Sequence, residues 1–407
     1  MRRAARLAPA CALLIGLGGA GAGADSGLDL KIGAALFKRA WAPAPASTRA
    51  DDGLGPLYDA RSCASCHPGA GRAAARFDPD GTASGRGLVL VIARADGAPD
   101  PVYGRRLQID AVPGLAPEGI VAVADTTLPD GRRARAPQAR DLAYGPLDPQ
   151  SRLSLRVAPD LRGRGALEAV SDAALLAVAA EQARAGGPVR GTARRVVLPD
   201  GRTVVGRYGW KAGEPDVAGQ TAEAFSLDLG LSTRLRPEPW GDCTAREPAC
   251  RAAPHGGRSP LSGGVEISDP IFSRVVAYVT SLPAPEGPAR DPAGEKIFAQ
   301  TGCAQCHRPR LPGADAALFT DALLHDMGEG LAGAPEPGAS AAQWRTAPLA
   351  GLSDALSRET GLLHDGRART LDEAVAWHGG EGAQSAARFS ALTPAQRAAL
   401  SAYLSKL

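Results

Sequence analysis

Short runs of hydrophobic residues, separated by Gly- and Pro-rich stretches, mark the first half of the chain and predict β-strands. Residues 88–92 and 120–123 are two such runs. Residues 196–205 predict a hairpin, because an Asp-Gly pair stands between two valine-rich runs. Residues 36–41 fit a short helix whose aromatic residues serve either a cofactor or the core. This part of the chain is expected to be a mixed α and β region.

Apolar residues recur with helical spacing in the later part of the chain. Residues 269–282 are the clearest case, since Ile271, Val275, Val276 and Val279 fall on one helical face. Further helices are predicted at residues 171–184, 294–300 and 393–404. The first of these starts at a Ser and the last at a Thr, which are good N-caps. The expected fold class is mainly α with a β-containing insertion.

A linker rich in Pro and Gly at residues 283–288 suggests two domains. Residues 25–285 would form an N-terminal domain that contains the mixed insertion, and residues 286–407 a compact C-terminal domain. Residues 1–24 have the basic start, apolar stretch and small-residue end of a signal peptide cleaved near Ala24. We therefore expect export to the periplasm. No later segment is long and apolar enough to span a membrane.

Two Cys-x-x-Cys-His motifs are the strongest chemical signal in the chain. They consist of Cys63, Cys66 and His67, and of Cys303, Cys306 and His307. This spacing is typical of c-type haem attachment, in which both thiols form thioethers and the His binds the iron. A pair of zinc or redox Cys-x-x-Cys motifs would not explain a His after both second cysteines. The motifs predict two covalently bound c-type haems in two cytochrome c-like domains.

The remaining cysteines fit an exported protein. Cys11 lies in the predicted signal peptide and would be lost on cleavage. Cys243 and Cys250 stand close together with no His nearby, and an oxidising compartment favours a disulfide between them. The formal net charge is only +3, and no basic run is interleaved with aromatic residues. This pattern argues against a nucleic-acid partner.

The supply of iron ligands differs between the two motifs. No His or Met occurs between residues 68 and 254, so the first haem has no strong sixth ligand nearby. It takes one from His255 or the C-terminal domain, uses a weaker group, or stays open, and an open iron binds peroxide. The second motif has several candidates, namely His325, Met327, His364 and His378. A lone His is more often structural, and we apply this interpretation to His255, His325 and His364.

With these motifs the chain resembles the bacterial dihaem cytochrome c peroxidase superfamily, and in particular its branch of dihaem oxidoreductases often named thiol oxidoreductases. The resemblance covers nearly all of the mature chain. Its supporting segments are residues 52–57, 142–147, 206–212, 325–328, 344–349 and 364–380. The thiol label gains no support, because no cysteine is left free.

The resemblance implies roles for several residues. In the peroxidases a distal Met of the second haem follows a His-Asp-Gly and a helix, and here His378 occupies that position. The second haem would then be ligated by His307 and His378, with Met327 as the alternative. The distal His that follows the first motif in the peroxidases is missing, which leaves the first haem accessible. Gln108 and Glu118 stand where the family has its peroxide-pocket Gln and Glu, and a Glu there moves protons during cleavage of the O–O bond.

The resulting hypothesis is a periplasmic dihaem oxidoreductase. Hydrogen peroxide would react at the first haem, and a donor such as a small cytochrome c or cupredoxin would supply electrons through the second. Trp41, Trp210 and Trp344 are candidates for a relay between the haems, with packing as the simpler interpretation. Oxidation of a partner protein or an organic molecule, and electron transfer without catalysis, are the alternatives. Calcium binding stays open.

Overall fold

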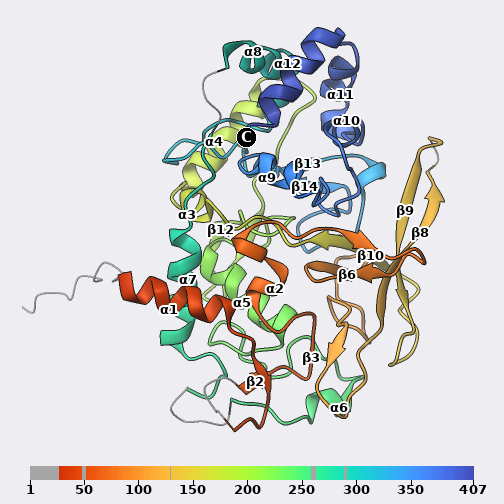
Figure 1. The fold of residues 1–407 in the computed structure, drawn as a ribbon, viewed down its shortest axis with the longest axis vertical. Helices are drawn as coiled ribbons and strands as arrows, with labels where there is room; N and C mark the ends of the chain where they lie inside the picture. The colour runs from red at the N-terminus through yellow and green to blue at the C-terminus, as the bar shows by residue number, and fades with distance from the viewer. Residues whose placement is uncertain (1–26, 48–51, 129, 258–262, 288–290) are drawn as a thin grey trace, which may run out of the picture.

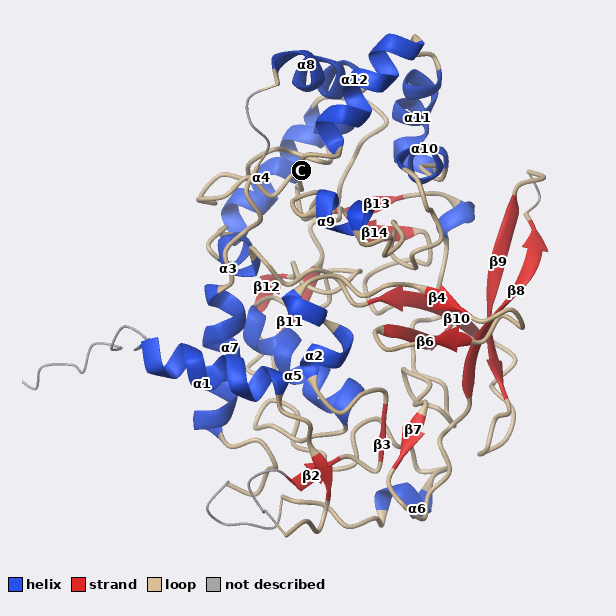
Figure 2. Ribbon diagram, viewed as in Figure 1, coloured by secondary structure: helices blue, strands red, loops and turns tan. Residues whose placement is uncertain are grey.

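The computed structural model combines α-helices with small sheets and describes residues 27–47, 52–128, 130–257, 263–287 and 291–407 (Figure 1). Figure 2 shows the helices at the left and top of the molecule and the longest strands at the right. The predicted signal peptide, residues 1–24 with Cys11, lies outside the described residues. Among the described helices, none has the length and apolar character that crossing a membrane requires.

The helices fall into two groups along the chain. Before the predicted linker lie α1 (Gly27–Lys38), α2 (Cys63–Cys66), α3 (Arg164–Glu168), α4 (Asp172–Arg184), α5 (Val217–Leu229), α6 (Pro248–Arg251) and α7 (Asp269–Ser281). After it lie α8 (Pro292–Gln300), α9 (Leu352–Ser357), α10 (Leu371–Ala376), α11 (Ala383–Ser390) and α12 (Pro394–Leu404). Short 3₁₀ helices are η1 (Pro68–Ala70), η3 (Cys303–Gln305), η4 (Glu329–Leu331) and η5 (Gly380–Gly382).

The strands form two-stranded sheets. The strands are β1 (Ala42–Pro43), β2 (Asp52–Leu54), β3 (Leu57–Tyr58), β4 (Arg76–Phe77), β5 (Ala83–Ser84), β6 (Leu88–Arg94), β7 (Asp110–Ala111), β8 (Ile120–Thr127), β9 (Arg133–Arg140), β10 (Ser151–Val157), β11 (Arg195–Val197), β12 (Thr203–Val205), β13 (Leu324–Asp326) and β14 (Gln343–Arg345). The pairs are β3–β7, β4–β5, β6–β10, β8–β9, β11–β12 and β13–β14, all antiparallel, and the parallel pair β1–β2. Most of these strands lie before the linker, so a mainly helical chain with a β-containing insertion is confirmed.

Capping residues explain where the predicted helices begin. The Ser171 hydroxyl accepts a hydrogen bond from the backbone N–H of Ala174 at the start of α4. Thr393 forms a reciprocal capping box with Gln396 at the start of α12. The two predictions therefore match the observed helices. The predicted amphipathic helix matches α7, whose Val275 and Val279 are buried.

Of the remaining predictions, those of the strands are confirmed, whereas that of a short helix is wrong. The strand predictions are confirmed by β6, β8 and the β11–β12 hairpin, in which Val196 lies opposite Val204. The predicted helix at residues 36–41 was misplaced, because α1 ends at Lys38. Trp41 lies beyond the helix and is buried in a hydrophobic cluster, where its ring meets Phe225 edge-on. Packing alone accounts for its position.

One hydrophobic core joins residues from both sides of the linker. It contains Leu167, Leu175 and Val178 from the first part together with Leu311, Leu318 and Leu323 from the second. The two parts of the chain therefore stabilise each other by burial of shared apolar surface. The domain boundary at residue 285 stays a prediction.

Candidate haem sites

The first Cys-x-x-Cys-His motif is built on the single turn of α2. The Ser62 hydroxyl caps this turn and accepts a hydrogen bond from the Ser65 backbone N–H at 3.2 Å. Cys63 and Cys66 are not joined in a disulfide, and Cys66 is buried. The turn thus offers two free thiols on one short, capped segment.

His67 ends this turn with its ring oriented by a backbone carbonyl. Its Nδ1 lies 2.8 Å from the carbonyl oxygen of Pro159, which only accepts hydrogen bonds, so Nδ1 carries the proton. Burial lowers the pKa of His67 to about 4, which keeps the imidazole neutral. The Nε2 lone pair is therefore available, and this is the usual state of a His that binds a metal.

The second motif repeats this arrangement in a different local structure. Gly302 adopts a φ of 89°, a left-handed conformation that favours Gly, and leads into η3. His307 follows, and its Nδ1 lies 3.2 Å from the carbonyl oxygen of Phe319. Burial, and then the neighbouring His378, lower the pKa of His307 to about 4. The second motif also presents a neutral imidazole with a free Nε2.

An apolar cavity lies against the second motif. Cys303, Cys306 and His307 line it together with His378 and Met327. Its walls include Leu331, Leu349, Leu352, Leu362, Leu363 and Leu371. Apolar walls with a few convergent polar groups are typical of cofactor sites. The porphyrin of a haem has the apolar character that these walls fit.

His307 and His378 come together in this cavity. Their ring centroids are 6.5 Å apart, with an angle of 53° between the planes. The Nδ1 of His378 lies 2.7 Å from the carbonyl oxygen of Ala374, one turn back in α10, so its Nε2 is also free. Metal–nitrogen bonds of about 2.0 Å place the centroids of two imidazoles about 6 Å apart across one metal ion. The spacing therefore fits a metal held from both sides.

Three arginines line the cavity, of which Arg164 and Arg345 are buried and Arg72 is half-buried. Each of the three hydrogen-bonds to backbone carbonyls. None of them forms an ion pair with a carboxylate of the described residues. Burial lowers the pKa of Arg72 to about 10 and that of Arg345 to about 9. Guanidinium groups without a carboxylate partner, two of them buried, favour an anionic ligand, and the two propionates of a haem supply such charge.

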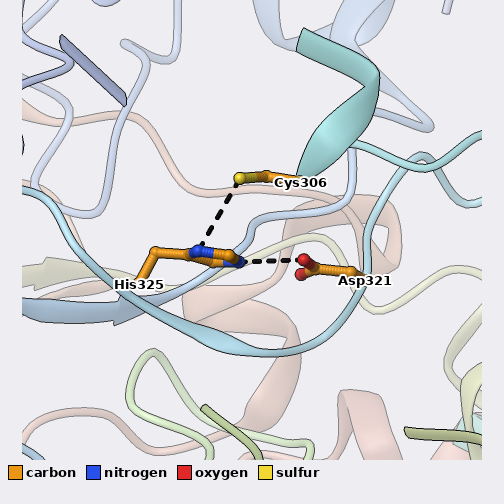
Figure 3. Close-up of side chains that lie close together, drawn as sticks. All are labelled: Cys306, Asp321 and His325. Atoms are coloured by element: carbon orange, nitrogen blue, oxygen red, sulfur yellow. Dashed lines mark hydrogen bonds and ion pairs between the residues drawn. The ribbon is translucent and has the colours of Figure 1, made fainter. Parts of the chain in front are cut away.

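His325 is held in a polar cluster beside Cys306 (Figure 3). Its Nε2 lies 2.8 Å from Asp321, its Nδ1 lies 2.7 Å from Glu381, and Cys306 Sγ is 3.7 Å from Nδ1. Burial opposes the charge, but these hydrogen bonds raise the pKa of His325 to about 12. An imidazolium has no free lone pair for a metal. The structural interpretation of His325 therefore fits, and the cluster is not a metal site.

The remaining candidate iron ligands for the second motif, Met327 and His364, line the cavity. Met327 lines it, and a Cβ at Gly382 would meet both Met327 Cε and His378 Cβ, so the two candidate ligands are neighbours. His364 stacks on Trp344 with centroids 3.6 Å apart, and Trp210 meets His364 edge-on at 6.4 Å. Trp210 and Trp344 therefore lie at the cavity, whereas Trp41 does not line it.

Gln108 and Glu118 lie together but away from this cavity. The Gln108 backbone N–H donates to Glu118 Oε2 at 2.6 Å, and Glu118 is 0% exposed. Neither residue lines the cavity at the second motif. Burial, and then Glu247, raise the pKa of Glu118 well above its usual range, and the two carboxyl groups hydrogen-bond each other. Gln108 and Glu118 therefore lie in contact, and their role in a peroxide pocket stays a prediction.

The loop that carries Glu247 contains the predicted disulfide. Cys243 and Cys250 are bonded, with Cα atoms 6.2 Å apart, which confirms this prediction. His255 lies beyond this loop, close to Gly257, and does not line the cavity. It therefore shows no sign of serving the second motif.

Several residues of the cavity were not predicted from the sequence. The three arginines lie far apart in the sequence. Only Arg345 belongs to a segment, residues 344–349, that supports the family resemblance. Glu381 was also missed, although it lies three residues after His378. Since their roles depend on contacts between segments far apart in sequence, no local pattern marks them.

A family model described as "Di-haem oxidoreductase, putative peroxidase" matches residues 136–407. The chain therefore belongs to this family of enzymes, as the resemblance predicted, and is an oxidoreductase with two haems. The match includes the second Cys-x-x-Cys-His motif but not the first, which rests on the residues of the chain itself.

Two solved structures are distant neighbours. The diheme peroxidase BthA from Burkholderia thailandensis is 17% identical, with a TM-score of 0.32, over 73% of this chain and 94% of that one. Hydrazine synthase from Kuenenia stuttgartiensis, pressurised with xenon, is 20% identical, with a TM-score of 0.25. That match covers 43% of this chain and 65% of that one, less than two thirds of its length. The search of curated proteins found no match.

Proposed function

We propose that this protein is an exported c-type dihaem peroxidase. Cys63 and Cys66 would attach one haem with His67 as its axial ligand, and Cys303, Cys306 and His307 would hold the other in the same way. Hydrogen peroxide would be reduced at the first haem. Electrons from a small cytochrome c or cupredoxin would enter at the second. The disulfide between Cys243 and Cys250 and the c-type motifs both support an oxidising, periplasmic location.

The unequal supply of ligands carries this proposal. His307 faces His378 at 6.5 Å, a spacing that suits a haem iron with two protein ligands. The first motif has no His or Met within residues 68–254, and His364 and Met327 lie in the cavity of the second. A haem supplies an iron that binds peroxide when one axial position is open and stores an electron when both are filled. The asymmetry therefore favours one reactive and one electron-storing site.

The chain's own residues would have defined tasks. The carbonyls of Pro159 and Phe319 fix the tautomers of His67 and His307, which would leave each Nε2 free to bind a haem iron. The apolar leucines would exclude water from the second site, and the cavity-lining arginines would bind the carboxylates of its haem. Glu118, with its raised pKa, would accept a proton from one peroxide oxygen and return it to the other.

Spin state and ligand binding test the proposal. Purified holoprotein should show one high-spin and one low-spin haem by EPR and resonance Raman spectroscopy, and cyanide should bind only the high-spin one. His67→Ala should abolish reaction with peroxide and leave the low-spin signal. Two low-spin haems that ignore cyanide would support an electron carrier instead. Rapid reaction with peroxide but turnover only with a partner protein would indicate a protein-oxidising enzyme.

Mass spectrometry tests the attachment. Denatured protein from a host with a c-type maturation system should carry the mass of two haems, and Cys303→Ser with Cys306→Ser should remove one of them. A chain that carries one haem or none would contradict the assignment of both motifs.

A further inference from the structure

Lys211 occupies an unusual position beside the cavity. It is 0% exposed, although it is a charged residue, and no carboxylate forms an ion pair with it in the described part of the chain. Its Nζ donates to the backbone carbonyls of Ser340, Ala341 and Gln343 at 2.8, 3.1 and 2.6 Å. A buried Lys without a carboxylate partner is rare and calls for a reason.

These contacts define the charge of Lys211. Burial, and then Arg156, lower its pKa to about 6. Three carbonyl acceptors, however, require three N–H donors, and only the ammonium form has three. A neutral amine would turn its lone pair toward one of these carbonyls. We therefore assign the ammonium form to the folded protein.

The ammonium lies against Trp344. Lys211 Nζ is 3.9 Å from the centroid of the Trp344 ring, and the Arg156 guanidinium carbon is 5.5 Å from it. His364 stacks on the same ring at 3.6 Å. Burial lowers the pKa of His364 to about 3, so this imidazole adds no positive charge. Trp344 is thus a cavity-lining tryptophan with two cations at its ring.

We propose that Lys211 keeps Trp344 from being oxidised when oxidising equivalents arise at the first haem site. This inference rests on the proposed function for the source of the oxidant. Loss of one electron from Trp344 to that oxidant leaves a radical cation. The proton stays on Nε1, because the indole N–H donates to the carbonyl of Leu331, which does not take a proton. The new positive charge then stands beside an ammonium in a site of low dielectric, where repulsion is strong.

Trp210 is the cavity tryptophan left for electron transfer between the sites. Its Nε1–H donates to the carbonyl of Val157 at 2.8 Å, two residues before the Pro159 carbonyl that holds His67. The guanidinium carbon of Arg72 lies 5.6 Å from the centroid of its ring. Arg72 is one of the three cavity-lining arginines, and a bound haem carboxylate would offset its charge. Trp210 therefore links the first motif to the cavity, and no lysine of the described residues places its ammonium over this ring.

A photochemical oxidant tests this inference independently of peroxide. Holoprotein with both haems is mixed with a ruthenium tris-bipyridine complex and a quencher, and a flash generates ruthenium(III), which removes single electrons. Tryptophan radicals are then counted by EPR and transient absorption. Lys211→Met should yield at least about tenfold more Trp344 radical than the native protein. The added signal should vanish in Lys211→Met with Trp344→Phe, and the exposed control Lys296→Met should not produce it.

A second arm covers the case in which Lys211→Met fails to fold. In the native background, Trp344→Phe should leave the radical yield unchanged, whereas Trp210→Phe should lower it. A Trp344 radical in the native protein would overturn the inference, and so would a folded Lys211→Met with both haems and no new radical. Absence of peroxide reactivity together with the expected flash pattern would contradict the proposed function alone.

Discussion

The rings of His307 and His378 line one cavity and lie with their centroids 6.5 Å apart. Each Nδ1 is engaged by a backbone carbonyl of a different segment, Phe319 for His307 and Ala374 for His378. Both Nε2 lone pairs are therefore free and fixed in direction before any metal binds. If a haem binds here as proposed, this preorganisation would favour a low-spin iron with two His ligands over one that takes Met327.

Substitution of the two candidate ligands separates these assignments. His378→Ala should convert the second haem from low to high spin, because its iron would lose the sixth ligand. Met327→Leu keeps the apolar volume and should leave the low-spin signal unchanged. EPR and resonance Raman spectra of both variants provide the measurement. A high-spin haem in Met327→Leu, with no change in His378→Ala, would assign the ligand to Met327.

His325 should be important for stability rather than for ligation. His325→Ala leaves Asp321, which is 0% exposed, and Glu381 without their cationic partner. Loss of one member of a buried ion pair costs about 3–5 kcal/mol, so the melting temperature should fall clearly. His325→Leu combined with Asp321→Asn removes the imidazolium and the more buried of its two carboxylates and should recover part of this loss. Unchanged stability in His325→Ala would contradict the ion-pair interpretation.

The pH dependence of this contribution has a definite sign. The folded pKa of His325 is raised to about 12, above the value of about 6.5 in an unfolded chain. Its contribution is therefore fully present below about pH 6.5 and is lost as the pH rises toward 12. The pKa values of Asp321 and Glu381 are lowered despite burial, so their contribution is lost in acid. Denaturant unfolding measures the free energy of unfolding of the native and His325→Ala proteins. The difference between them should be largest at pH values above the loss of the carboxylate contribution and below the loss of the His325 contribution.

Much of the fold could be predicted from local sequence signals. Contacts between segments far apart in the chain could not be predicted in this way. The caps Ser171 and Thr393 mark α4 and α12 in the sequence itself. β9 was missed because it alternates Arg and Ala and has no hydrophobic run, and it exists as the partner of β8. The motif histidines were evident from spacing. Lys211 was not, because its acceptors lie about 130 residues further along the chain.

The disulfide should contribute modestly to stability. Closing the loop between Cys243 and Cys250 removes about 2–3 kcal/mol of unfolded-state entropy. The double Ala variant should fold, keep both haems and melt at a lower temperature than the native protein. Haem content by pyridine haemochrome and thermal unfolding by circular dichroism are the measurements. Loss of a haem would show that these cysteines do more than close a loop.

The same loop leads to the proton chemistry at Glu118. Glu247 stands between the two cysteines, is 0% exposed and hydrogen-bonds the Glu118 carboxyl. Two carboxyl groups in one hydrogen bond share a proton, since both cannot ionise at so short a distance. Burial and this neighbour raise the pKa of Glu118, so it ionises at a higher pH than an exposed Glu. A shuttle must be ionised to accept a proton from peroxide, so the rate should rise with pH as Glu118 ionises.

Glu118→Gln should therefore slow the reaction with peroxide by about 10²-fold and remove this step from the pH profile. Stopped-flow mixing of holoprotein with hydrogen peroxide measures both effects. Glu266→Gln is the matched control, because Glu266 is a partly buried Glu with a pKa raised to about 7 that contacts Ser232 and Gly256 instead. Its variant should keep the native rate and profile. If Glu118→Gln reacts at the native rate while both haems are present, Glu118 only bridges Gln108 and Glu247, and the proton must move through another group.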